Sequence, residues 1–89
     1  MPFRYSVSLN RDAEKQLKKL AKAQPSAFQR VTNAIKDLAY NPRPDGVKKL
    51  KGTGNGYRVR VGEYRVLYTI EDREVTVWVY RVASRQGAY

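Results

Sequence analysis

The hydrophobic positions of this 89-residue chain recur with two periods, about 3.6 residues in the first half and two residues in the second. Apolar and polar side chains alternate over residues 4–9, which predicts a short half-buried strand. Asn10 then caps a helix over residues 11–23, where apolar residues recur at helical spacing and lysines flank them. Gln24-Pro25-Ser26 breaks this helix and starts a second, expected to run to about Tyr40. The link is very short, so the two helices should form an antiparallel hairpin.

Turn-forming residues 41–46 close the helical half, and strand patterns follow. The Gly62-Glu63 pair sits between two alternating runs and predicts a type II′ hairpin turn. Asp72-Arg73 predicts a second tight turn. The expected strands cover residues 47–50, 57–61, 64–70 and 74–82.

This order of elements predicts an α+β fold in a single domain over residues 1–89. An N-terminal strand precedes an antiparallel helical hairpin, which packs on one face of a twisted antiparallel β-sheet. The other face of the sheet is then left open.

The hairpin register decides what the open face carries. If Val61 and Tyr64 flank the Gly62-Glu63 turn, the apolar residues of both strands face the helices, and Arg60 lies directly across from Arg65. The open face then holds Arg58, Arg60, Arg65 and Leu67. Like charges in opposed positions cost stability, so this placement favours a role in holding an anion.

Aromatic and further basic residues extend this pattern. Carrying the register through the second turn sets Tyr80 beside Arg65 and Trp78 beside Leu67. Guanidinium groups beside aromatic rings grip phosphates and stack on unpaired bases. We therefore predict that a set of basic and aromatic residues binds RNA: Lys48, Lys49, Lys51, Trp78 and Tyr80. The alternative is an arginine-bearing strand face that serves only solubility.

The amino-acid composition limits the kinds of catalytic and metal site that the chain can form. Lys and Arg number 18 against 8 Asp and Glu, for a formal net charge of +10, and the chain contains no Cys and no His. This excludes a thiol nucleophile, a disulfide framework, a Ser-His-Asp triad and a zinc site with its usual ligands. The charge favours nucleic acid or an acidic protein as partner. We expect no cofactor; Glu71, Asp72 and Glu74 are interpreted as a solvated hairpin tip rather than a metal site.

The N-terminal residues lack the apolar run of a signal peptide, and no stretch approaches the length of a membrane span. A cytoplasmic protein without membrane contact is therefore expected.

Leu50-Lys51-Gly52, the run over residues 56–68, and Arg85 and Tyr89 behind the last strand together resemble the RelE/ParE superfamily of bacterial toxins. The resemblance covers nearly the whole chain. It implies the toxin half of a toxin–antitoxin pair, held inactive by an antitoxin that wraps around it and is expected to be acidic. RelE-type members cleave mRNA in the ribosomal A site, whereas ParE-type members inhibit DNA gyrase.

Carried over by position, the family's cleavage site falls on Arg58, Arg60, Arg65, Arg85 and Tyr89. The tail pair Arg85 and Tyr89 favours the RelE branch, with the ribosome and mRNA as partners. The resemblance then implies that the predicted RNA-binding set contacts RNA or the ribosome. RelE itself has lysines where this chain has Arg58 and Arg60, and many relatives carry His where it has Ser84. An arginine stays protonated in proteins and does not act as a general base.

Three functions follow from the sequence. The leading hypothesis is a metal-independent, ribosome-dependent endoribonuclease that inhibits translation. The alternative is a ParE-type gyrase inhibitor without catalysis. A plain nucleic-acid-binding domain is the third and weakest.

Overall fold

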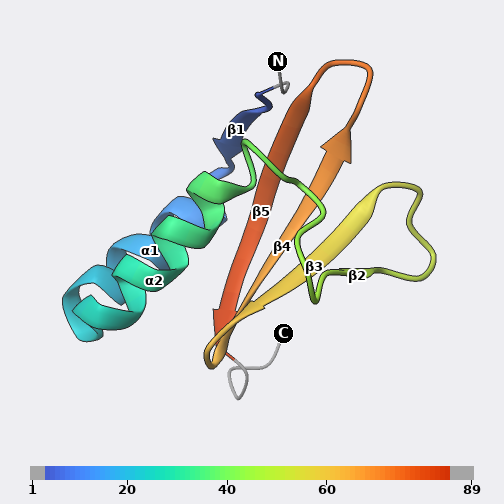
Figure 1. Cartoon of the computed structure of the whole chain (residues 1–89). Helices are drawn as coiled ribbons and strands as arrows, with labels where there is room; N and C mark the ends of the chain where they lie inside the picture. The colour runs from blue at the N-terminus through green and yellow to red at the C-terminus, as the bar shows by residue number, and fades with distance from the viewer. Residues whose placement is uncertain (1–3, 85–89) are drawn as a thin grey trace.

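The computed structural model describes residues 4–84. One strand comes first, two helices follow it, and four further strands complete the predicted order (Figure 1). The elements are β1 (Ser6–Leu9), α1 (Arg11–Ala23), α2 (Pro25–Asp37), β2 (Lys48–Lys49), β3 (Gly56–Val61), β4 (Tyr64–Glu71) and β5 (Thr76–Ser84). The predicted α+β fold, with a helical hairpin beside a sheet, is confirmed. Neither helix of this described part is long and apolar enough to cross a bilayer.

Local chemistry sets the helix ends. The Asn10 side chain accepts a hydrogen bond from the backbone N–H of Ala13 at 2.9 Å, which is the predicted N-cap of α1. Pro25 occupies the start of α2, where its missing N–H costs no hydrogen bond. Helix α2 ends at Asp37, and residues 38–40 form a turn, so the helix is slightly shorter than expected.

The sheet has the order β1-β5-β4-β3-β2 and is mixed rather than antiparallel throughout. Tight turns or short loops join β2 through β5, which forces antiparallel pairing among them. Strand β1 instead pairs parallel to β5. Both helices lie between β1 and β2 in the sequence, and this long connection runs to the opposite edge of the sheet. It therefore does not determine whether β1 pairs parallel or antiparallel to β5.

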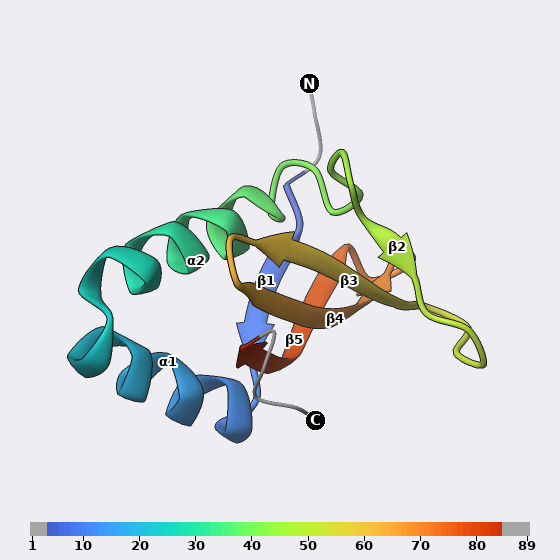
Figure 2. The ribbon, with the colours of Figure 1, turned by 90° about the horizontal axis from the view of Figure 1, so that it is seen from below.

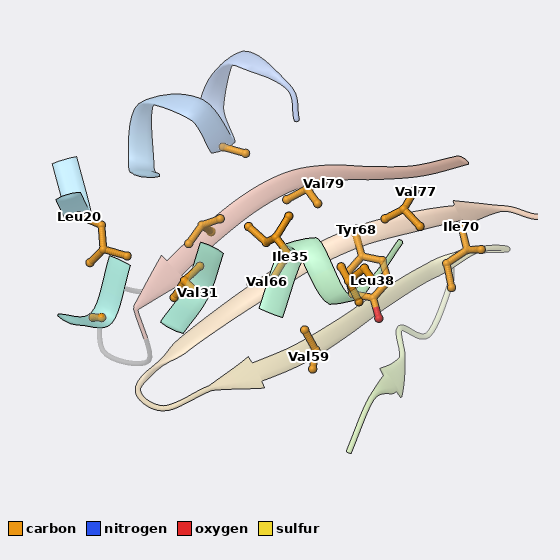
Figure 3. Packing of buried hydrophobic residues seen from close by; sticks show 13 residues of the cluster. Leu20, Val31, Ile35, Leu38, Val59, Val66, Tyr68, Ile70, Val77 and Val79 are labelled. Atoms are coloured by element: carbon orange, nitrogen blue, oxygen red, sulfur yellow. The ribbon is translucent and has the colours of Figure 1, made fainter. Parts of the chain in front are cut away.

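The helices cover one face of the sheet and bury a single hydrophobic cluster against it (Figures 2 and 3). Val31 and Ile35 of α2 meet Val66 and Tyr68 of β4 in this layer (Figure 3). The Tyr68 hydroxyl is also buried and donates to the backbone carbonyl of Pro42 at 2.7 Å. Burial raises the pKa of Tyr68 to about 12. The segment that follows α2 is thereby attached to the core.

A charged network attaches the same segment to the sheet edge. Arg43 forms a salt bridge with Asp72 at 2.9 Å, and the Tyr5 hydroxyl donates to the same carboxylate at 2.7 Å. These hydrogen bonds, from Arg43 first and Tyr5 second, lower the pKa of Asp72. The Arg43 guanidinium also lies over the Tyr57 ring, 5.2 Å from its centroid. Asp72 is therefore a structural partner and not only part of a solvated tip.

The turn between β4 and β5 is longer than predicted. Glu71 pairs with Thr76, so four residues separate the strands rather than Asp72 and Arg73 alone. Val75 closes the turn at a φ of +52°, a left-handed conformation that β-branched residues rarely adopt. Its carbonyl nevertheless accepts from Ser6 of β1 at 2.9 Å. The two-residue turn expected from the sequence is wrong because nothing in a valine signals this backbone conformation.

Candidate functional site

The β3–β4 hairpin has the predicted register. Val61 pairs with Tyr64 around Gly62-Glu63, and Gly62 has a φ of +60°, as the first position of a type II′ turn requires. Arg60 consequently lies directly opposite Arg65. The predicted opposition of two arginines is confirmed.

The same register separates the two faces. Val59 and Val66 pair with one another and are buried under the helices. Because successive strand residues point to opposite faces, their neighbours point to the face that the helices leave open. Arg60 is exposed there, and Arg65 is half-buried. One set of basic residues on this open face is called the cationic face: Lys48, Arg58, Arg60, Arg65 and Arg81.

A β-bulge shifts the register between β4 and β5 and corrects two predicted neighbours. Arg65 pairs with Ala83 rather than with Tyr80, and Leu67 pairs with Arg81 rather than with Trp78. Tyr80 is the extra residue of the bulge and is half-buried. The predicted contacts of Tyr80 with Arg65 and of Trp78 with Leu67 are therefore wrong.

Arg81 was not among the predicted site residues, although the chain carries a signal for it. Buried valines of β5 stand at 77 and 79 and then at 82, so the alternation skips by one residue. A skip of this kind marks a bulge. Odd-numbered residues are buried before the bulge and the even-numbered Val82 is buried after it, so Arg81 points to the open face. Lys48, Arg58, Leu67 and Arg81 thus form one row across four strands.

The remaining predicted binding residues do not all lie on the open face of the sheet. Trp78 is 43% exposed and pairs with Thr69 of β4 and Ser8 of β1, so it lies on the open face toward the far edge of the sheet. Lys49 pairs with Tyr57, whose ring stacks on Tyr68, and so belongs to the helix-covered side. Lys51 is exposed in the loop after β2.

Two predicted catalytic residues, Arg85 and Tyr89, lie outside the described residues. Strand β5 ends at Ser84, which pairs with Tyr64. Tyr64 also pairs with Val61, beside the row that contains Arg60 and Arg65.

The cationic face can bind phosphate groups. Its members come from four adjacent strands, whose backbones are spaced about 4.8 Å apart, so several guanidinium groups can reach one polyanion. Arginines can stabilise negative charge that develops on phosphoryl oxygens, but they do not remove a proton. Within residues 4–84, no group of three or more acidic, Cys or His side chains could hold a metal ion.

Comparison with known proteins identifies relatives over almost the whole chain. The family model described as "ParE toxin of type II toxin-antitoxin system, parDE" matches residues 7–89. A protein of Methanocaldococcus jannaschii that carries the toxin name RelE1 is 32% identical over 90 residues, which cover 98% of this chain and 97% of that protein.

Solved structures agree with this result. A chain of the archaeal RelE–RelB complex from Pyrococcus horikoshii OT3 matches with a TM-score of 0.79 and 30% identity, over 97% of this chain and 100% of that one. A chain of the toxin–antitoxin complex RelBE2 from Mycobacterium tuberculosis matches with a TM-score of 0.78 and 32% identity, over 93% of each chain.

Proposed function

Because this chain belongs to the ParE toxin family and is a RelE-like toxin of a type II toxin–antitoxin system, we propose that it is a ribosome-dependent endoribonuclease that cleaves mRNA in the A site. The observation that carries the proposal is the cationic face: arginines from β3, β4 and β5 share one open surface, two of them in directly opposed positions.

The proposed reaction uses a nucleophile that RNA itself supplies. The 2′-oxygen attacks the adjacent phosphorus in line, the 2′-O–P bond forms, and the bond from phosphorus to the 5′-oxygen breaks. The 2′-OH loses a proton and the leaving 5′-oxygen gains one. Arg58, Arg60 and Arg65 stabilise the charge that develops on the phosphoryl oxygens. Arg85 clamps phosphate or assists the leaving group, and Tyr89 transfers a proton or stacks on a base.

This set of residues explains why the reaction would need the ribosome. As arginines, Arg58 and Arg60 supply no general base. Orienting the 2′-OH in line with the scissile bond can contribute about 7 kcal/mol or more to lowering the barrier. Binding of the codon in the A site would supply this orientation, which a free RNA chain does not keep.

The proposal also includes an antitoxin partner and a cytoplasmic location, where ribosomes and mRNA are found. The matched archaeal and mycobacterial structures are complexes of a RelE-type toxin with its antitoxin. A net charge of +10 favours an acidic partner. We propose that this antitoxin wraps around the toxin and blocks it. The predicted Lys48, Lys49, Lys51, Trp78 and Tyr80 contacts with RNA or ribosome remain part of the proposal.

Alanine variants in reconstituted translation test the proposal. Arg65→Ala and Arg85→Ala should abolish cleavage of ribosome-bound mRNA and relieve growth arrest while the protein stays folded. Lys15→Ala on the exposed surface of α1 is the matched control and should cleave normally. Undiminished cleavage by both site variants would overturn the assignment of the site.

A second candidate function is inhibition of DNA gyrase, favoured by the family model, whose description names the ParE toxin. In that case the cationic face would bind gyrase and would catalyse no reaction. Inhibition of supercoiling together with intact mRNA in a translating system would select this function over the first.

A further inference from the structure

Trp78 of β5 is the single tryptophan of the chain and lies on the open face of the sheet. Its neighbours Val77 and Val79 are fully buried in the cluster beneath the helices, so the Trp78 side chain points to the opposite face. The residue is 43% exposed there, and it pairs with Ser8 of β1 and with Thr69 of β4. Both of these neighbours are too small to cover an indole ring. A broad aromatic surface is therefore accessible to a planar ligand.

The charge of the open face changes in steps along β4. Four rows cross this face, one at every second residue of the strand: Arg65, Leu67, Thr69 and Glu71. The first two rows hold all members of the cationic face. The third row contains Trp78 and, within the described part of the chain, no charged residue. The fourth contains the carboxylate of Glu71. Positive charge thus ends one row before Trp78, and negative charge begins one row after it.

This order of charges limits where the parts of an RNA strand can lie. Phosphate groups are attracted to the first two rows and repelled by Glu71, whose carboxylate accepts a hydrogen bond from the Asn55 side chain. An uncharged base fits the row between them. Neighbouring rows are two strand residues apart, about 6.7 Å, which is close to the length of one nucleotide of an extended chain. A strand whose phosphates lie on the cationic face can therefore place a base on Trp78 without a break in its path.

We propose that Trp78 is a stacking platform for one base of the single-stranded RNA whose phosphates bind the cationic face. Trp78 then acts as a positioning residue, because a stacked base fixes the strand relative to the opposed pair of Arg60 and Arg65. Aromatic rings stack on every base and most strongly on the larger purines, so the platform should favour a purine. That the bound RNA is mRNA on the ribosome rests on the proposed function; that Trp78 stacks on an RNA base does not.

The long turn between β4 and β5 separates Trp78 from the arginines. The two-residue turn expected from the sequence would set Trp78 beside Leu67, among the guanidinium groups, whereas the observed turn sets it beside Thr69, one row further along β4. A guanidinium stacked on the indole ring would compete with a base for the same surface. Phosphate binding and base stacking therefore fall to different residues, and the two can be measured separately.

Trp78 provides its own signal, because no other tryptophan contributes to the fluorescence of the protein. The purified protein is titrated, at about 50 mM salt, with an RNA of about six adenylates and with a matched chain that carries the same phosphates but no bases. Both should bind, but only the RNA with bases should quench Trp78 strongly, and it should bind about tenfold more tightly. Equal quenching by the two chains, or the absence of saturable binding of the RNA, would overturn the proposal.

Variants separate stacking from charge, with binding of the fluorescein-labelled adenylate RNA read by fluorescence anisotropy. Trp78→Ala should weaken binding about tenfold and leave the slope of log K against log salt unchanged, because no phosphate contact is lost. Arg58→Gln should reduce that slope by about 1 and keep the full quenching of Trp78 at saturation. Tyr40→Ala is the matched control: it removes the other exposed large hydrophobic residue of residues 4–84 and should bind as tightly as the wild type. Circular dichroism checks that each variant is folded.

If Trp78→Ala binds as tightly as Tyr40→Ala, or lowers the salt slope as Arg58→Gln does, no base stacks on Trp78 and the proposal is wrong. Trp78→Phe keeps an aromatic ring and should recover most of the affinity that the alanine variant loses; a variant as weak as Trp78→Ala would also contradict stacking. These assays contain no ribosome, so absence of the proposed mRNA cleavage would leave their result unchanged. Cleavage by a protein whose Trp78 is not quenched by RNA would refute the platform and leave the proposed function standing.

Discussion

Arg60 of β3 lies directly opposite Arg65 of β4 on the open face of the sheet. Opposed like charges on neighbouring strands destabilise a sheet. In this hairpin the apolar residues on the other face, led by the buried pair of Val59 and Val66, hold the register that imposes the opposition. The arginine pair is thus retained against a local cost, which is expected where an anion is bound.

Replacing Arg60 with threonine should therefore stabilise the fold while impairing activity. Threonine favours strands and removes the like-charge opposition, so the free energy of unfolding should rise by about 0.2–1 kcal/mol. Urea unfolding measures this change, and cleavage of ribosome-bound mRNA measures the loss. Arg60→Lys keeps the charge and should show neither the gain in stability nor an equal loss of cleavage. A destabilised but fully active Arg60→Thr would contradict the interpretation.

Arg81 should contribute to RNA binding because the bulge places it beside Leu67, in the row that contains Arg58. Arg81→Gln should reduce the slope of log K against log salt by about 1 for a single-stranded RNA, as expected when one phosphate contact is lost. Arg73→Gln, in the turn before β5, removes the same charge outside the row and should leave most of the slope intact. Equal effects of the two variants would mean that only total charge matters.

The extent to which the sequence predicted this arrangement depended on the turns. A glycine at the first position of a two-residue loop specified the β3–β4 hairpin, so its register and the Arg60–Arg65 opposition followed from local residues. The β4–β5 register did not follow from a two-residue turn, because the left-handed Val75 has no local sequence signal and the skipped valine spacing of β5, which marks the bulge, was not part of the prediction. For the same reason the open face carries Arg81 beside the β4 residues, where Tyr80 was predicted.

The direction of β1 was not predictable either. No hairpin joins β1 to β5, and alternation of apolar residues is the same in parallel and antiparallel edge strands. The helices, by contrast, were predictable from Asn10, Pro25 and the helical spacing of their apolar residues. The roles of Arg85 and Tyr89 came only from the family resemblance, and their positions lie outside the described residues.

Tyr68 should make the fold sensitive to alkaline pH. Burial raises its pKa to about 12 from the usual 10.0, so the folded state favours the protonated phenol. Its contribution to stability is fully present below pH 10.0 and is lost as the pH rises through about 12. Tyr68→Phe should lose about 1 kcal/mol at neutral pH, because the Pro42 carbonyl loses its donor, and should lack part of the alkaline decline. Chemical denaturation at a series of pH values measures both effects, and an unchanged alkaline decline in Tyr68→Phe would refute this role.

Asp72 should make the opposite contribution at acidic pH. The hydrogen bonds from Arg43 and Tyr5 lower its pKa below the usual 3.8, so the folded state favours the carboxylate. That stability is present above pH 3.8 and is lost as the pH falls through the lower, folded pKa. Asp72→Asn should show a shallower acid decline in urea unfolding. Glu74→Gln removes a carboxylate from the same turn without touching Arg43, and should retain the decline; identical profiles for both variants would count against the network.

Mapping the 5′ ends of mRNA after brief expression of the protein tests whether this RelE-like toxin cleaves mRNA on the ribosome. We predict new 5′ ends at codons that occupy the ribosomal A site, present with the wild type and absent with Arg65→Ala. Growth arrest without such ends, with wild-type and Arg65→Ala profiles indistinguishable, would show that the protein does not act by cleaving mRNA in the A site.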